Sequence, residues 1–126
     1  MTQQEFFKEW SGKYPKCFDE LKKYLQNHYV DYFYYNENEY QYEIRLECLN
    51  EICKFEILFG IINKFFREYD ILFVAPTYSE FGWGFDIMDI LENERFNDYM
   101  EHRIENPEKT IMLAILKSAE ILENIL

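Results

Sequence analysis

The sequence has little of several features that define common classes of protein. Its 126 residues include only four glycines and three prolines, which disfavours a loop-rich or repetitive all-β fold. Its three cysteines suggest neither a disulfide framework nor a common zinc site, because the one close pair, Cys48 and Cys53, has four residues between its members. The histidines are His28 and His102. The longest apolar run, residues 57–62, is far too short to span a bilayer.

The start of the chain also lacks the pattern of a secretion signal. The segment MTQQEFFKEW has no positively charged start followed by a run of apolar residues. An odd number of cysteines without a disulfide framework favours a reducing compartment. The sequence therefore predicts a cytoplasmic protein with no membrane partner.

Basic residues are scarce relative to acidic ones. The chain has 13 lysines and arginines against 24 aspartates and glutamates, a formal net charge of −11. Binding to a phosphate backbone depends on basic side chains that displace counterions, so direct nucleic-acid binding is disfavoured. The same field repels anionic membranes. Such a charge favours a basic partner, or serves solubility alone.

Aromatic residues, in contrast, are abundant. The sequence contains 12 phenylalanines, 11 tyrosines and two tryptophans. Each such side chain removes roughly 150–250 Å² from water when it is buried, and disordered chains are poor in these residues. A chain of this length buries roughly two-thirds of the surface that it exposes when unfolded. We therefore expect one folded domain over residues 1–126.

The spacing of apolar residues predicts four or five helices. Thr2 is a candidate N-cap of the first, and Asn106 followed by Pro107 marks the start of the last. Apolar residues recur three or four positions apart along each segment. The expected helices span residues 2–10, 16–34, 49–68, 91–105 and 107–126.

Two segments, 70–76 and 81–88, predict an antiparallel hairpin, with 40–46 as a third strand in some arrangements. In the second segment Phe81, Trp83, Phe85 and Ile87 alternate with Gly82, Gly84, Asp86 and Met88. The aromatic side is expected in the core, and Pro76 is expected to end the pairing of the first strand. The glycines leave a shallow trough for a helix or a ligand. The predicted fold class is α+β, with helices packed on a small two- to three-stranded antiparallel sheet and a long C-terminal helix.

No motif of known chemistry is present, so no catalytic residue, metal ligand or cofactor is predicted. His102 with Glu101 and Glu105 is a weak metal-binding pattern on a solvated face. The serines and cysteines lack a base to activate them. Four carboxylates keep a small magnesium-dependent enzyme as one alternative: Asp70, Glu80, Asp86 and Asp89.

Negative charge is concentrated in the later part of the chain. Residues 79–126 hold 11 acidic and four basic residues, a net of −7, whereas residues 1–78 hold 13 and nine, a net of −4. On the expected helix over 91–105, acidic residues recur at helical spacing. The predicted partner-binding acidic face consists of Asp89, Glu92, Asp98, Glu101 and Glu105. A row of carboxylates of this kind can imitate a nucleic-acid backbone or fill a basic groove; a merely solvated face is the alternative.

A second candidate surface is rich in tyrosine. Tyrosine combines an apolar ring and a polar tip with few rotatable bonds, which suits an interface. The candidate interface aromatics are Tyr32, Tyr35, Tyr40 and Trp83. They make a homodimer or another protein contact the second functional hypothesis.

Three segments, FFREYDILFVAP, EFGWGFDI and AILKSAEILENIL, together resemble small uncharacterised proteins of bacterial phages and mobile elements. The resemblance covers residues 49–126 and implies a helix–hairpin–helix core before an apolar last helix. Some small acidic proteins of this kind inhibit host defence, including anti-CRISPR proteins, and would act in the host-cell cytoplasm. The resemblance assigns no functional residue.

These observations favour a non-enzymatic acidic protein that occludes a basic surface of a partner, such as a nucleic-acid-binding machine. A self-associating structural or accessory protein and a small metal-dependent enzyme are the alternatives.

Overall fold

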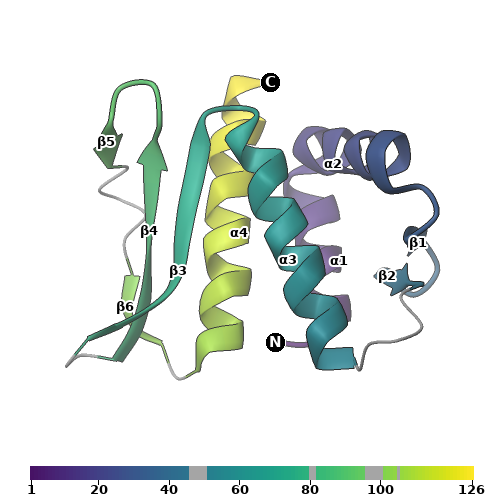
Figure 1. Ribbon diagram of the computed structural model, residues 1–126, viewed down its shortest axis with the longest axis horizontal. Coiled ribbons are helices and arrows are strands. Elements are labelled where there is room, and N and C mark those ends of the chain that lie inside the picture. Colours follow the sequence, from purple (N-terminus) through teal and green to yellow (C-terminus); the bar gives the residue numbers. More distant parts are fainter. Residues whose placement is uncertain (46–50, 80–81, 96–100, 105) are drawn as a thin grey trace.

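The computed structural model describes residues 1–45, 51–79, 82–95, 101–104 and 106–126. These residues form four helices and six strands (Figure 1). The helices are α1 (Gln3–Lys13), α2 (Pro15–Tyr29), α3 (Glu51–Arg67) and α4 (Pro107–Ile125). The strands are β1 (Phe33–Asn36), β2 (Gln41–Ile44), β3 (Ile71–Ser79), β4 (Gly82–Asp89), β5 (Glu94–Arg95) and β6 (Glu101–Ile104). The predicted α+β fold class and the long C-terminal helix are confirmed.

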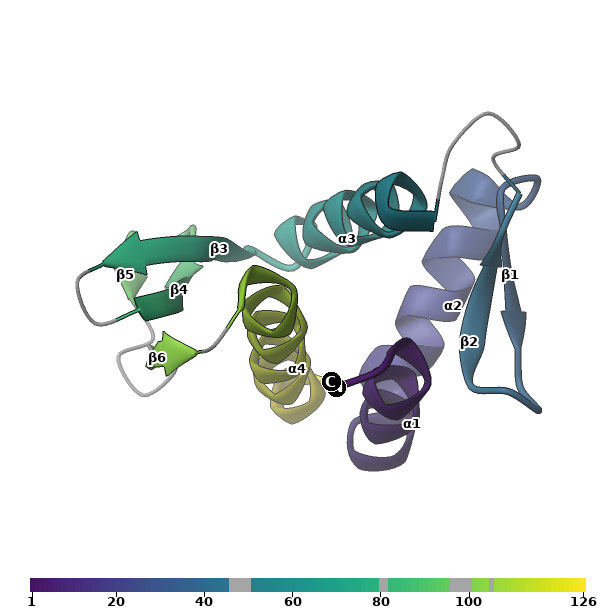
Figure 2. The same cartoon turned by 90° about the horizontal axis from the view of Figure 1, so that it is seen from below.

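The larger sheet is organised around β4, which pairs antiparallel with β3 on one side and with β5 and β6 on the other. Phe73 of β3 lies opposite Ile87, and Trp83 lies opposite Ile104 of β6. β1 and β2 form a separate antiparallel hairpin that packs beside α2 (Figure 2). The predicted third strand at 40–46 therefore pairs with β1 and does not join β3 and β4.

α4 lies between the larger sheet and the helices α1 and α2, and α3 lies beside it and also contacts β3 (Figure 2). α4 can contact both the sheet and these helices because its apolar residues cover more than one side: Ala114, Ile115, Ala119 and Leu122 have no exposed surface. The Asn106 side-chain oxygen accepts a hydrogen bond from the backbone N–H of Lys109 at 2.8 Å, which caps the first turn as predicted.

The core on the other side of α4 is largely aromatic. α1 contributes three fully buried rings, Phe6, Phe7 and Trp10, and Thr2 caps this helix through its hydroxyl. The Trp10 ring stacks on Phe66 of α3 with centroids 5.8 Å apart. Rings on helices far apart in the sequence thus join α1 to α3 directly.

Three further predictions about helices and strands need correction. The helix expected over 16–34 ends at Tyr29, and residues 33–36 form β1, where Phe33 is buried and Tyr34 is exposed. β3 continues past Pro76, because the register shift between Val74 and Thr77 leaves the proline out of the ladder. The segment expected as a helix over 91–105 contributes β5 and β6, which pair with β4.

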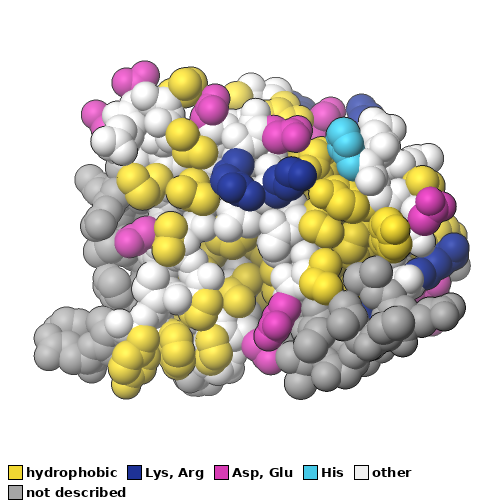
Figure 3. Space-filling model, in the orientation of Figure 1, with side chains coloured by type: hydrophobic (Ala, Val, Ile, Leu, Met, Phe, Trp, Pro, Cys, Tyr) yellow, Lys and Arg dark blue, Asp and Glu magenta, His cyan; other side chains and the backbone are white. Residues whose placement is uncertain are grey.

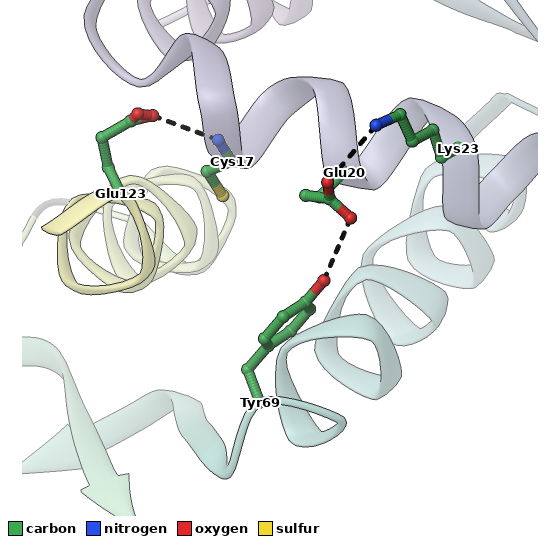
Figure 4. Close-up of polar contacts among 5 residues, drawn as sticks. All are labelled: Cys17, Glu20, Lys23, Tyr69 and Glu123. Atoms are coloured by element: carbon green, nitrogen blue, oxygen red, sulfur yellow. Dashed lines mark hydrogen bonds and ion pairs between the residues drawn. The ribbon is translucent and has the colours of Figure 1, made fainter. Parts of the chain in front are cut away.

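α2 is capped by a side chain from the other end of the chain (Figure 4). The side chain of its N-cap residue, Tyr14, makes no capping hydrogen bond. A Glu123 carboxylate oxygen on α4 accepts hydrogen bonds from the backbone N–H groups of Lys16 at 2.7 Å and Cys17 at 3.1 Å. A carboxylate there satisfies unpaired donors and interacts favourably with the helix dipole. Nearby, the Tyr69 hydroxyl donates to Glu20 at 3.3 Å, which ties α2 to the end of α3.

Replacing Glu123 with alanine is expected to lower the free energy of unfolding by about 1–2 kcal/mol, as loss of an N-cap does. Urea titration followed by circular dichroism measures this change. Glu120 provides the matched control, since it lies on the same helix and its nearest ion-pair contact, with Lys117, is 3.9 Å long. Glu120→Ala is expected to cost about 0.5 kcal/mol or less. Equal losses in the two variants would contradict the capping role.

Candidate partner-binding surface

The turn between β4 and β5 forms one corner of the molecule (upper left in Figure 1). A side-chain oxygen of Asp89 accepts hydrogen bonds from the backbone N–H groups of Leu91 at 3.0 Å and Glu92 at 3.4 Å. Asn93 has a φ of 53°, a left-handed conformation that asparagine tolerates better than most residues. The sequence of the turn therefore fixes its own shape.

Asp70, which connects α3 to β3, completes this corner. Its carbonyl oxygen accepts a hydrogen bond from the backbone N–H of Ile90 at 2.9 Å. We call Asp70 together with residues 89–94 the sheet tip. It is held by backbone pairing of β3 with β4 and of β4 with β5, so its side chains project from a defined frame.

The sheet tip combines negative charge with exposed apolar surface. It carries four carboxylates and no basic residue; the four are Asp70, Asp89, Glu92 and Glu94. Between them Leu91 is 76% exposed and Ile90 is 43% exposed. Figure 3 shows acidic and apolar side chains side by side at this corner. A surface of this composition suits a basic partner that also offers an apolar contact.

The predicted acidic face is only partly assembled at this tip. Asp89 and Glu92 belong to it, whereas Glu101 lies on β6, where it pairs with Phe85. The expectation that Glu101 shares a helical face with Asp98 and Glu105 is wrong, because residues 101–104 form a strand. Asp98 and Glu105 lie outside the described residues, as does the side chain of Glu101.

Sequence reasoning missed the apolar part of the tip. Ile90 and Leu91 follow the alternating strand directly and read as its continuation. The available signal was the segment LENE, in which an asparagine between glutamates favours a turn. A turn at this point would have placed the preceding apolar residues at an exposed end of the sheet.

The tyrosine-rich surface lies on the hairpin of β1 and β2. Tyr32, Tyr34 and Tyr40 are 48%, 55% and 40% exposed, respectively. Tyr35 instead points toward the core, where its ring lies 5.0 Å from that of Phe18. A hollow of about 450 Å³ separates part of the hairpin from α2.

Burial keeps the inner tyrosines of this hairpin neutral. It raises the pKa of the Tyr42 hydroxyl well above its usual range, and raises that of Tyr35 as well. The Tyr42 ring packs on Phe7 with centroids 5.2 Å apart. Tyr35 and Tyr42 therefore act as core residues, and only the outer tyrosines remain available to a partner.

Trp83 and the glycines beside it form the far end of the β3–β4 hairpin. Trp83 is half-buried, and its ring lies 5.0 Å from that of Tyr78. Gly84 is buried opposite Thr77, so the expected trough is closed at that residue. Gly82 has a φ of 115°, a conformation that strongly favours glycine at the start of β4.

A search for metal-binding clusters, for membrane-spanning helices and for similar proteins assigns no further role to these surfaces. Among the described residues, no cluster of three or more His, Cys, Asp or Glu is placed to hold a metal ion. No helix in that part of the chain has the length and apolar character needed to cross a membrane. Comparisons with protein-family models, curated protein sequences and solved structures find no match.

Proposed function

We propose that the protein is a non-enzymatic binding protein whose sheet tip covers a basic surface of a partner protein. The observation that carries this proposal is the exposure of Leu91, which is 76% accessible among carboxylates on a hydrogen-bonded turn. Folding gains nothing from a leucine left in water, whereas an interface gains from its burial.

The two components of the tip have different tasks. The carboxylates of Glu92 and Glu94 attract a basic surface and orient it during encounter. Leu91 and Ile90 then supply the apolar area that is removed from water in the complex. Because the turn is already ordered by the Asp89 side chain, binding requires little additional loss of conformational entropy.

The proposed partner class is a protein with a groove lined by lysine and arginine, such as a nucleic-acid-binding machine. Closely spaced carboxylates present charge to such a groove as phosphates do. The net charge of −11 also supports a basic partner, since it adds long-range attraction to any such protein. Self-association through Tyr32, Tyr34 and Tyr40 is the second candidate, supported by their exposure.

The first experiment is a pull-down from the source cell with the wild-type protein, followed by mass spectrometry. Affinity for the captured partner is then measured by calorimetry at low and high ionic strength. Wild-type binding should weaken as salt rises. The double variant Glu92→Lys/Glu94→Lys should bind about tenfold or more weakly, and Leu91→Ser about tenfold more weakly.

The hairpin supplies a control with the same change in net charge. Glu39 and Glu43 are exposed near the outer tyrosines, so Glu39→Lys/Glu43→Lys alters the charge equally but leaves the tip intact. This control should bind nearly as well as the wild type. If the hairpin variant loses as much affinity as the tip variant, or if salt has no effect, the proposed role of the tip is wrong.

A further inference from the structure

α3 has one side that no described element covers. Its buried side packs into the core through Leu58, Ile62, Phe65 and Phe66. On the opposite side, exposed residues recur at helical spacing, and Figure 1 shows this side facing the viewer with no ribbon in front of it. We call this side the α3 outer face; it consists of Glu56, Ile57, Gly60, Lys64 and Arg67.

Gly60 lies in the middle of this face, where no packing contact among the described residues calls for a glycine. Glycine is less favourable than alanine in a helix interior. A Cβ atom built at Gly60 would meet nothing within 4 Å, so no neighbour among the described residues requires a glycine at this position. A missing side chain at an exposed helix position does allow the backbone of a second helix to approach closely.

Charges of opposite sign lie at equal distances along the helix on the two sides of Gly60. Glu56 lies four residues before it and Lys64 lies four residues after it, so both lie on the same side of the helix. Figure 3 shows basic groups toward one end of α3 and an acidic group toward the other. If a second α3 runs antiparallel across a two-fold axis at Gly60, each Glu56 lies next to the other helix's Lys64.

We propose that the α3 outer face binds a second copy of this chain, with the two α3 helices antiparallel and in closest contact at Gly60. Such an interface is self-complementary, as two-fold symmetry requires. It provides two Glu56–Lys64 pairs, and it buries Ile57, which is 39% exposed in the isolated chain. This surface is separate from the sheet tip.

Local charge favours this face over the rest of a strongly acidic chain. The α3 outer face contains Lys64 and Arg67 against Glu56, which is two positive charges against one and a net of +1. Two chains of net charge −11 repel each other over most of their surfaces. An approach through α3 avoids placing like charges opposite one another.

The arrangement has a consequence for the sheet tips. Asp70 of the tip is the third residue after the end of α3, so the tip lies at the C-terminal end of that helix. Antiparallel α3 helices then place the two tips at opposite ends of the dimer. One dimer would therefore offer two separate binding sites to basic partners.

A single helix pair buries less than the roughly 1,200 Å² of a standard interface, so the dimer is expected to be weak. Sedimentation equilibrium up to about 500 µM should detect it. Gly60→Leu should raise the dissociation constant roughly tenfold or more, because the side chain separates the helices. Gly12→Leu is the matched control: Gly12 is also exposed in a helix, with open space around its Cβ position. Thermal melts establish that both variants fold.

A charge exchange then tests the antiparallel arrangement. Glu56→Lys and Lys64→Glu should each weaken the homodimer by placing like charges together. Mixing these two variants should restore association as a heterodimer, and the double variant Glu56→Lys/Lys64→Glu should restore the homodimer. The proposal is overturned if the wild type stays monomeric at the highest concentration, if Gly12→Leu weakens the dimer as much as Gly60→Leu, or if the charge exchange restores nothing. It is also overturned if Tyr32→Ser and Tyr34→Ser abolish the dimer, since another surface would then form it.

Discussion

Replacing Trp10 with alanine is expected to lower the free energy of unfolding by about 3–5 kcal/mol, the usual cost of truncating a large buried ring. Trp10 has no exposed surface. Its ring stacks on Phe66 of α3 and lies 5.5 Å from Phe18 of α2. The truncation would therefore leave a cavity where three helices meet, and close-packed neighbours collapse only partly into such a space.

The second tryptophan of the chain is the natural control. Trp83 is half-buried at the end of the β3–β4 hairpin, so Trp83→Ala should cost much less than Trp10→Ala. Urea unfolding followed by circular dichroism suits both variants, because it does not depend on tryptophan fluorescence. A loss of equal size in the two would show that Trp10 does not have the central packing role described above.

The thiol of Cys17 is expected to react with alkylating and disulfide reagents roughly 1,000-fold more slowly than an exposed thiol at pH 8. Cys17 has no exposed surface, and burial raises the pKa of its thiol to about 12. An unperturbed cysteine has a pKa near 8.5. At pH 8 a much larger fraction of an exposed cysteine than of Cys17 is therefore present as the reactive thiolate. Burial also prevents the reagent from reaching the thiol, so the reaction should take place only after the domain unfolds.

The measurement uses a variant in which Cys48 and Cys53 are replaced by serine, so that one thiol remains. Labelling is followed with and without urea, and the unfolded chain should react at the rate of a free peptide. The raised pKa also predicts that stability falls as the pH rises above about 8.5, because only the unfolded state then releases the Cys17 proton. Fast labelling of the folded variant in the absence of urea would contradict the buried environment.

Local signals in the sequence were sufficient for part of the fold. Asn106 and Pro107 define the start of α4, and the alternation at Phe85 and Ile87 defines the core side of β4; both features depend only on neighbouring residues. The boundary between α2 and β1 was harder, because the closely spaced aromatics around Phe33 fit either period.

Long-range pairing explains most of what could not be predicted. β5 and β6 are short, and they form strands because the free side of β4 offers hydrogen-bonding partners. The cap of α2 comes from Glu123, 107 positions away from Lys16, which no local pattern can indicate. Periodicity alone placed residues 91–105 on a helix, and therefore misplaced Glu101.

The charge pattern of the sequence predicted acidic residues of the candidate site, but it did not predict the exposed apolar residues beside them. The acidic bias of the later segment identified Asp89 and Glu92, which the structure places at the sheet tip. Whether an apolar side chain near them is buried depends on where the sheet ends. For that reason the exposure of Leu91 could be learned only from the structure.

The central position of α4 has a consequence for how the domain forms during synthesis. α4 packs against the larger sheet and against α1, α2 and α3, yet its residues are translated after all of those elements. When only the earlier elements of a nascent chain have emerged from the ribosome, their aromatic side chains are therefore uncovered. Such intermediates are prone to aggregate. Chaperones at the ribosome exit should bind this chain until residues 107–125 have emerged.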